Sequence, residues 1–196
     1  MEIRETAHRF AAEWEGGVSE DKNDPGGLTM YGVATHFMTD FAKTAKGKEI
    51  CRRLAIPTPI SRASMLTIDR DDARIILLAA FFDGLDDLHP CLAMTTYDAR
   101  LNCGDKQGIK FLQRAARINV PNLADDGLIG PRTRGACEAR VREICERAIR
   151  YREAYYRSIA ASNPKLAKFL RGWLNRAAAL RDAVRPLLPP PGDRRP

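Results

Sequence analysis

Three polar residues near the N-terminus have the types and spacing that the cleavage of a glycosidic bond requires. Glu15 is followed nine positions later by Asp24, and Thr29 comes five positions after Asp24. Glycoside cleavage needs an acid that protonates the leaving oxygen and a second group that holds water or stabilises the cationic transition state. A glutamate followed by a polar loop that returns an aspartate and a threonine supplies both. The alternative interpretation is that the loop around Gly26-Gly27 is only a turn.

Glu15 directly follows a predicted amphipathic helix. The helix is indicated by apolar residues at helical spacing, namely Ile3, Ala7, Phe10, Ala11 and Trp14. Gly16-Gly17 should end it, because glycine readily takes the left-handed conformation just past a helix end. The negative end of the helix dipole and the neighbouring Trp14 disfavour a charged carboxylate at Glu15, as a general acid working near neutrality requires. The alternative is a solvated glutamate in front of a glycine cap.

The rest of the chain predicts helices and no convincing strand, so the predicted fold class is all-α. Residues 18–30 are rich in Asp, Asn, Pro and Gly and predict a loop. Helices are expected over about 38–54, from a cap at Thr67 or Asp69 through Phe82, after His89-Pro90, from Lys106, and over about 164–185. Pro131 suits the first position of a helix. A long helix with an arginine-rich outer face is indicated by the apolar positions Cys137, Val141, Ile144, Ala148, Tyr151 and Tyr155.

The segment around Glu15 resembles the signature of glycoside hydrolase family 108, the N-acetylmuramidases of phages and of bacterial toxin-secretion systems. The resemblance rests on Glu15-Gly16-Gly17 and on the segment DPGGLTMYGV at residues 24–33. It implies that Glu15 is the catalytic glutamate. The order of Glu15, Asp24 and Thr29 is also similar to the catalytic trio of tailed-phage lysozymes, which implies that Asp24 and Thr29 position water or stabilise charge. Val18 stands where the family usually has tyrosine.

Further segments extend the resemblance over about residues 7–180. Tyr97-Asp98 with Asn102-Cys103-Gly104 resembles a second family element, and Tyr31 belongs to the first. The resemblance thus implies that Tyr31, Asp98 and Asn102 bind substrate. The alternative for Asp98 and Asn102 is that they are buried polar residues bracing the catalytic loop.

The C-terminal half resembles predicted peptidoglycan-binding regions. The segment DGLIGPRT at residues 126–133 carries this resemblance, although it can equally be a plain helix-entry turn, and Trp173 can equally be a core residue. The whole resemblance implies a lysozyme-like helical fold with the C-terminal helices packed on the catalytic part. The expected parts are a catalytic part over 1–95, a peptidoglycan-binding part over 96–185 and a Pro-rich tail over 186–196. The first two can also form one continuous globule.

Charge is distributed unevenly along the chain. Residues 1–98 hold 11 Lys and Arg against 16 Asp and Glu, a net of −5, whereas residues 99–196 hold 21 against 9, a net of +12. A basic half favours an anionic partner, either a cell-wall polymer or a nucleic acid. No nucleic-acid recognition motif is present, so peptidoglycan glycan strands are the expected partner and nucleic acid is not.

No cofactor, metal site or stable membrane insertion is expected. The five cysteines and three histidines lack zinc-ligand spacing, and no apolar run approaches the roughly 20 residues that span a bilayer. The cysteines are expected to be buried free thiols.

The leading hypothesis is a peptidoglycan hydrolase that cuts the β-1,4 bond between N-acetylmuramic acid and N-acetylglucosamine, as a phage or prophage endolysin or a secretion-linked muramidase. The alternative is a non-catalytic wall-binding secretion accessory. The N-terminus lacks the apolar core of a secretory signal. We therefore expect synthesis in the cytoplasm and action on the wall after holin-type or dedicated release.

Overall fold

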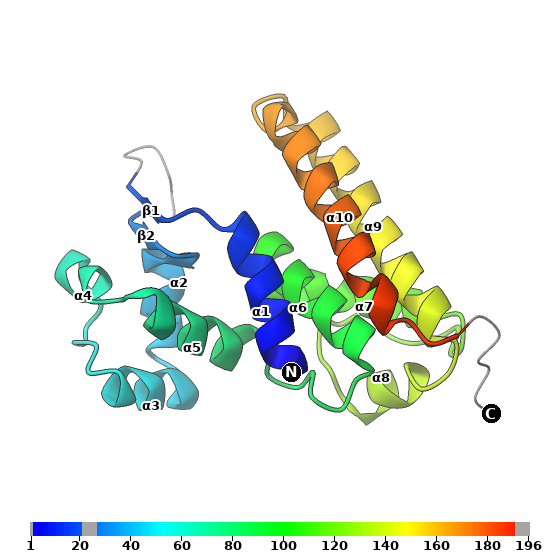
Figure 1. The fold of residues 1–196 in the computed structure, drawn as a ribbon, viewed down its shortest axis with the longest axis horizontal. Coiled ribbons are helices and arrows are strands. Elements are labelled where there is room, and N and C mark those ends of the chain that lie inside the picture. The colour runs from blue at the N-terminus through cyan, green and yellow to red at the C-terminus, as the bar shows by residue number, and fades with distance from the viewer. Residues whose placement is uncertain (1, 21–26, 191–196) are drawn as a thin grey trace. The chain divides into compact units, whose positions relative to one another are not determined.

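The computed structural model describes residues 2–20 and 27–190 of the chain (Figure 1). The chain divides into two compact units. We call Ala11–Asp83 the hairpin unit, and Met1–Phe10 together with Gly84–Pro196 the helical unit. Helix α1 (Ile3–Trp14), which was predicted, contributes its first residues to the helical unit and its last to the hairpin unit.

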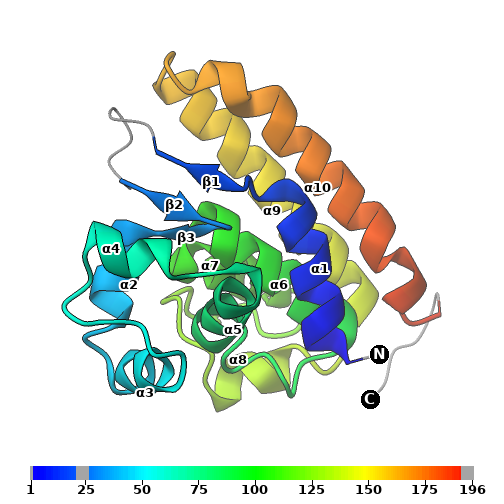
Figure 2. The ribbon, with the colours of Figure 1, turned by 60° about the vertical axis from the view of Figure 1, so that its left-hand side comes forward.

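The hairpin unit contains a small antiparallel sheet (Figure 2). Strands β1 (Val18–Ser19), β2 (Thr29–Met30) and β3 (Val33–Ala34) pair in chain order. Tyr31 and Gly32 join β2 to β3 with φ of 50° and 88°, and positive φ at both positions is typical of a type I′ hairpin turn. The prediction of a strandless loop over residues 18–30 is therefore wrong, because strands of two residues are too short to show alternation.

The helices of the hairpin unit are α2 (Thr35–Phe41), α3 (Ala45–Arg53), α4 (Arg62–Leu66) and α5 (Arg70–Phe81). The helix predicted over 38–54 is thus two helices. The second of them, α3, begins after the N-cap residue Thr44, whose side chain accepts a hydrogen bond from the backbone N–H of Gly47 at 2.9 Å. Helix α5 begins at a capping box formed by Asp69 and Asp72, as the cap prediction for Asp69 requires. The buried core of this unit includes Met30, Val33, Met38, Met65, Ile76 and Leu77.

Helix α6 (Pro90–Cys103) is the central helix of the helical unit, because every residue from Cys91 to Arg100 is buried. Helix α7 (Asp105–Ala116) packs closely on it. A Cβ atom at Gly108 would lie 2.4 Å from the backbone nitrogen of Arg100. Only glycine therefore allows this approach of the two backbones.

Two long helices lie side by side against this core in both ribbon views (Figures 1 and 2). They are α9 (Val141–Ser162) and α10 (Leu170–Val184), joined through the 3-10 turn η1 (Ala167–Phe169). Helix α8 (Pro131–Ala136) precedes them and has Pro131 at its start, as predicted. The turn η2 (Arg185–Leu187) follows α10. The single helix predicted over 164–185 is therefore the short turn η1 followed by α10, and it ends at Val184.

The buried face of α9 differs from the predicted apolar stripe. Val141, Ile144 and Ala148 are buried as predicted, but the face then continues through Arg152 and Tyr156, while Tyr151 is 38% exposed. Steps that alternate between three and four residues have a period of 3.5, whereas a straight helix has 3.6 residues per turn. The predicted stripe therefore drifts off the buried face. Cys137 lies outside α9, at the end of α8.

The all-α fold prediction is confirmed, apart from the small sheet. No helix within residues 2–20 and 27–190 is long and apolar enough to cross a membrane. Of the predicted Pro-rich tail, residues 191–196 lie outside the described part of the chain.

Candidate active site

Glu15 lies one residue beyond the end of α1, in the hairpin unit, and its side chain is half-buried. Its backbone N–H still donates to the carbonyl of Ala11 at 3.2 Å, as in a helix. Neither Gly16 nor Gly17 has a positive φ, so the predicted left-handed cap is wrong. The chain instead leads into β1, and the carbonyl of Gly17 accepts a hydrogen bond from the backbone N–H of Tyr31 at 3.1 Å. Pairing with the hairpin thus sets the backbone after Glu15.

The turn of the β2–β3 hairpin lies directly against the Glu15 side chain. A Cβ atom at Gly32 would lie 3.2 Å from Glu15 Cγ, 3.4 Å from Glu15 Oε2 and 3.4 Å from Leu77 Cδ1. The backbone of Gly32 also has a φ of 88°, which side-chain-bearing residues rarely adopt. Glycine at this position therefore permits both the turn and its contact with the carboxylate.

Thr29 and Tyr31 belong to the same hairpin. Thr29 is half-buried on β2, and its neighbour Met30 is buried on the opposite face, as strand alternation requires. The ring of half-buried Tyr31 lies under the guanidinium of Arg70, which is 4.8 Å from the ring centroid. This cation–π contact covers one face of the ring and helps to hold the ring in place. The hairpin thus brings a threonine, a tyrosine and the contact with Glu15 together within four residues, 29–32.

Asp24, the predicted partner carboxylate, lies outside the described residues. The structure resumes at Gly27. On the near side of this segment, Glu20 forms a two-pronged ion pair with Arg62 of α4, with both N–O distances at 2.9 Å. This pair ties the end of the β1 segment to α4.

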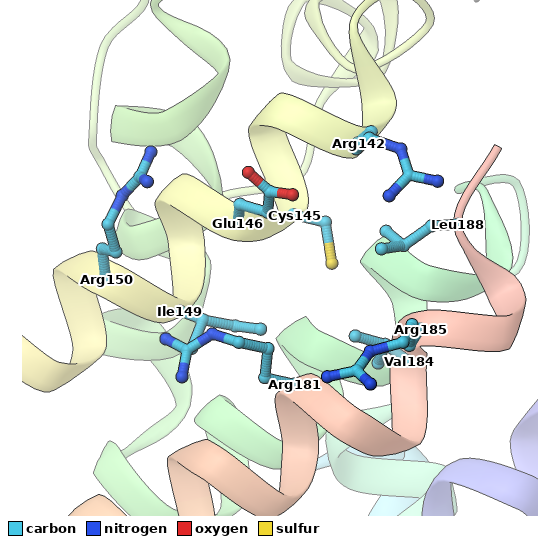
Figure 3. A pocket seen from close by; sticks show the side chains of 9 residues that line it. All are labelled: Arg142, Cys145, Glu146, Ile149, Arg150, Arg181, Val184, Arg185 and Leu188. Atoms are coloured by element: carbon cyan, nitrogen blue, oxygen red, sulfur yellow. The ribbon is translucent and has the colours of Figure 1, made fainter. Parts of the chain in front are cut away.

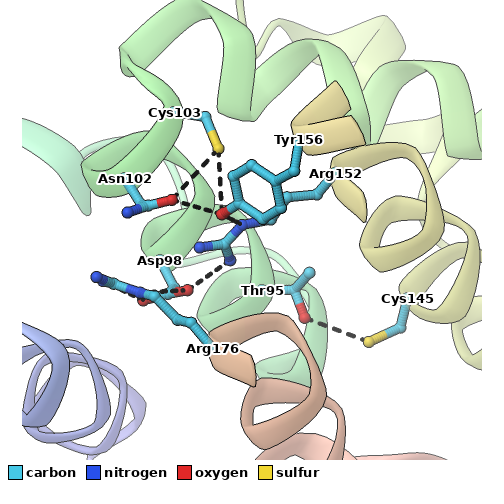
Figure 4. Close-up of polar contacts among 8 residues, drawn as sticks. All are labelled: Thr95, Asp98, Asn102, Cys103, Cys145, Arg152, Tyr156 and Arg176. Atoms are coloured by element: carbon cyan, nitrogen blue, oxygen red, sulfur yellow. Dashed lines mark hydrogen bonds and ion pairs between the residues drawn. The ribbon is translucent and has the colours of Figure 1, made fainter. Parts of the chain in front are cut away.

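Asp98 lies in the helical unit and is fully buried (Figure 4). Oδ2 accepts a hydrogen bond from Arg152 at 2.5 Å, and Oδ1 accepts two from Arg176, from Nη2 at 2.7 Å and Nε at 3.1 Å. Burial by itself would raise the pKa of this carboxyl, but the two guanidinium groups hold it below its usual range. Asp98 therefore joins α6 to α9 and α10 within the helical unit.

Asn102 stands one helical turn after Asp98 and is half-buried. Its side-chain oxygen accepts a hydrogen bond from the Tyr156 hydroxyl, which in turn accepts one from Arg152 (Figure 4). Burial raises the pKa of Tyr156, so its hydroxyl stays protonated and donates. Tyr156 binds the side-chain oxygen of Asn102, so the amide NH2 group of Asn102 does not take part in this hydrogen bond. The described residues offer that NH2 group no hydrogen-bond partner.

Arg152, Arg176 and Tyr156 are structural partners of Asp98 and Asn102 that sequence reasoning missed. The arginines of α9 were assigned to its outer face, and for Arg152, which is 1% exposed, that prediction is wrong. The usable signal is spacing, since Ala148, Arg152 and Tyr156 follow each other at four-residue steps on one helix face. An arginine on an otherwise apolar face predicts a buried anionic partner.

The segment DGLIGPRT is organised as a helix-entry turn. Buried Gln113 of α7 donates to Asp126 at 2.8 Å and to the carbonyl of Leu128 at 2.9 Å, and it accepts a hydrogen bond from the backbone of Gly127 at 2.9 Å. Thr133 lies 3.2 Å from the same amide nitrogen. These contacts attach the start of α8 to α7, so the segment has a structural task.

No group of three or more metal-binding side chains gathers within the residues that the structure describes. All five cysteines are free, and Cys51, Cys91, Cys137 and Cys145 are buried, whereas Cys103 is half-buried. Burial raises the pKa of Cys137 to about 12, which keeps that thiol unreactive.

Comparison with protein families assigns the two parts of the chain. Residues 8–104 match the family described as glycosyl hydrolase 108. The chain carries a glycosyl hydrolase 108 domain. Residues 107–178 match a second family, described as a predicted peptidoglycan domain. Together the two matches make the protein a glycoside hydrolase of the muramidase class that acts on peptidoglycan.

The fold is similar to that of a solved protein, described as Brucella abortus SagA. The superposition has a TM-score of 0.71 and 20% sequence identity, and covers 92% of this chain and 93% of the other. No protein with a curated description matches the chain.

The glycosyl hydrolase 108 match spans the hairpin unit and α6, and so includes Glu15, Thr29, Tyr31, Asp98 and Asn102. The peptidoglycan-domain match begins in α7 and ends within α10. The boundary predicted between residues 95 and 96 falls inside α6, and the functional division at that point stays a prediction.

Proposed function

We propose that this peptidoglycan hydrolase cuts the β-1,4 bond between N-acetylmuramic acid and N-acetylglucosamine, with Glu15 as its general acid. The observation that carries the proposal is the contact between the Glu15 carboxylate and the hairpin turn at Gly32. The Glu15 side chain is half-buried and directly follows the C-terminal end of α1, so the helix and the hairpin turn together set its position.

In the proposed reaction, Glu15 acts first. Protonated Glu15 gives its proton to the glycosidic oxygen as the bond from that oxygen to the anomeric carbon breaks. The departing sugar leaves with a hydroxyl, and the anomeric carbon develops positive charge. Water then adds to that carbon, with Thr29 and Asp24 holding the water or stabilising the charge, and the proton that the water releases is balanced by reprotonation of the Glu15 carboxylate. Tyr31 offers a ring and a hydroxyl to the substrate.

The side chain of Asn102 contributes a hydrogen-bond donor. Its amide oxygen is engaged by Tyr156, so the NH2 group is the part that can bind a sugar hydroxyl or an N-acetyl carbonyl. Asp98 acts through its neighbours as a positioning residue. Its carboxylate fixes Arg152, Arg152 binds Tyr156, and Tyr156 orients Asn102.

Replacement of Glu15 by glutamine tests the assignment, because an amide cannot donate the proton. We expect the Glu15→Gln variant to lose lysis of purified sacculi by a factor on the order of 10²–10⁴. The matched control is Glu13→Gln, which makes the same change at an exposed position of α1 and should lyse at the wild-type rate. Mass spectrometry of the wild-type products should find muramic acid at the new reducing ends.

The alternative of a non-catalytic accessory predicts a different result. Wild-type protein would then bind sacculi without releasing any soluble muropeptide. Near-normal lysis by a correctly folded Glu15→Gln protein would instead leave the enzyme intact and remove Glu15 from its mechanism.

We further propose that the enzyme is a phage or prophage endolysin or a secretion-linked muramidase that reaches the wall by holin-type or dedicated release. Its substrate lies outside the cytoplasmic membrane, so a cytoplasmic enzyme must cross that barrier. Expression in a bacterial cytoplasm should lyse cells only when a holin is co-expressed. Rapid lysis without one would contradict this delivery route.

A further inference from the structure

A hollow of about 430 Å³ opens between α9, α10 and η2 of the helical unit (Figure 3). Its volume lies within the range of small-ligand sites. Four of its lining residues are arginines, namely Arg142 and Arg150 of α9, Arg181 of α10, and Arg185 at the start of η2. We call it the arginine hollow.

The floor of the arginine hollow is apolar. Ile149 of α9 and Val184 of α10 are each 1% exposed, and Leu188 closes one end. The Cys145 side chain, which is fully buried, also faces the hollow in Figure 3. The hollow therefore combines a cationic rim with a hydrocarbon base, which suits an anion that carries small apolar groups.

The positive charge of the rim is only partly neutralised. Arg181 pairs with Glu153 at 2.8 Å and Arg185 pairs with Asp182 at 2.6 Å, but both of these carboxylates lie outside the lining. Glu146 is the one carboxylate among the lining residues.

The two arginines of α9 that line the hollow form no ion pair with a carboxylate among the described residues. Arg142 donates to the carbonyl of Pro189 at 2.6 Å and 3.0 Å, a contact that leaves its charge uncompensated. Arg150 has no hydrogen-bond or ion-pair partner among the described residues. An arrangement that holds like charges together is stabilised by a bound anion.

We infer that the arginine hollow binds the acidic peptide stems of peptidoglycan through their carboxylates. The inference rests on the proposed function, because it assumes that the wall is the substrate. Stem peptides carry carboxylate-bearing residues next to alanines, so they present anions and methyl groups at short spacing. Guanidinium groups bind carboxylates in a planar, two-pronged geometry, and the apolar floor accommodates the methyl groups.

The position of the hollow agrees with this assignment. Arg142 and Arg150 lie inside the segment 107–178 that matches the peptidoglycan domain, whereas Arg181 and Arg185 lie beyond it. The site is therefore completed by residues outside the family match. Stem recognition would hold the polymer while the glycan chain is cut.

The test measures binding of a free stem tetrapeptide to the full-length protein by calorimetry at moderate salt. We expect the double variant Arg150→Gln/Arg185→Gln to raise the Kd by about tenfold or more, since two charge-assisted contacts are lost. The matched control, Arg157→Gln/Arg171→Gln, removes two charges from exposed positions of α9 and α10, outside the hollow. Its Kd should stay within about twofold of the wild-type value, a limit set by screening of distant exposed charges.

Three results would overturn the inference. In the first, the control variant weakens binding as much as the hollow variant does, which would show that the effect comes from overall charge. In the second, a tetrapeptide with amidated carboxylates binds as tightly as the free acid, which would show that the carboxylates are not recognised. In the third, inorganic phosphate displaces the peptide at equal concentration, which would make the hollow a phosphate site.

Two further measurements keep the outcome interpretable. If circular dichroism shows that the double variant is unfolded, Arg150→Gln alone takes its place, because this side chain has no partner among the described residues. A free peptide contains no glycosidic bond, so its binding is read independently of cleavage. The Glu15→Gln protein should bind it with the wild-type Kd even if Glu15 proves not to be the acid.

Discussion

The side chain of Glu15 is constrained from two directions. Helix α1 places it at a C-terminus, and the hairpin turn then covers part of it from a segment more than fifteen residues away in the chain. Gly32 is the residue through which the second constraint acts, because any larger side chain would occupy the space next to the carboxylate.

Gly32→Ala tests this constraint at the residue scale. The new methyl group would press on Glu15 Cγ and would sit on a backbone with a φ of 88°. We expect lysis of sacculi to fall by tenfold or more, because displacement of a reacting group by about 1 Å can cost a factor on the order of 10². We also expect a loss of about 1 kcal/mol in the free energy of unfolding.

Gly16→Ala is the control for this variant. Gly16 has open space around its Cβ position and no positive φ, so activity and stability should stay near wild type. Equal activity of the two variants would show that the turn does not set the position of the acid.

At the scale of elements, the helical unit is held together by charge as well as by apolar packing. Asp98 of α6 binds Arg152 of α9 and Arg176 of α10, and all three side chains are at least 95% buried. Buried ions are costly to desolvate, and the loss of one partner leaves the others uncompensated. The network therefore fixes one particular arrangement of the three helices.

Asp98→Asn should destabilise the protein by about 3–5 kcal/mol near pH 7, because two buried guanidinium groups lose their counter-ion. The comparison is Asp40→Asn, which breaks an ion pair with Lys43 at 2.7 Å in which both side chains are at least 70% exposed. That loss should be far smaller, because exposed ion pairs contribute little to stability. Urea denaturation at neutral pH measures both. Equal losses would contradict the structural role of Asp98.

The same network predicts a pH dependence. The pKa of Asp98 is lowered in the folded protein, so its contribution is present above the unfolded pKa of about 4 and is lost as the pH falls through the lower folded value. Wild-type protein should therefore lose stability towards acid pH, and Asp98→Asn should lack this part of the loss. Denaturation curves at several pH values below 5 would show whether the two proteins converge.

At the scale of the whole molecule, the two families divide the chain differently from its compact units. The glycosyl hydrolase 108 match includes α6, whereas the compact units place α6 at the centre of the helical unit. A fragment limited to residues 107–178 would lack that buried helix. Wall binding is therefore best measured on the full chain.

The net charge of +12 in residues 99–196 predicts that wall binding depends on salt. Full-length Glu15→Gln protein should bind purified sacculi more weakly as salt rises from low to moderate concentration, because exposed charges are screened beyond about 8 Å at physiological ionic strength. Pull-down over a salt series measures this. Binding that ignores salt would show that the basic surface is only solvated and that recognition comes from sugar contacts.

The amino-acid sequence was enough to predict most of the helices and the acid candidate, but it merged α2 with α3 and missed the short α4. Helix starts and ends are decided by nearby residues, as at Asp69 and Pro131, so they can be predicted without the tertiary structure. Glu15 was predicted because its segment resembles a family signature. Its role still stands as a proposal.

The tertiary structure alone decided the features that depend on contacts between residues far apart in the chain, namely the strands and the burial of charged side chains. The strands of the hairpin exist because they pair with one another, and strands of two residues leave no sequence pattern. Arg152 and Asp98 lie 54 positions apart in the chain, and each is buried because the other neutralises it. Neither residue by itself therefore predicts the burial. Burial of a charge becomes tolerable only when the fold supplies its partner, and that partner is chosen by the packing of α6, α9 and α10.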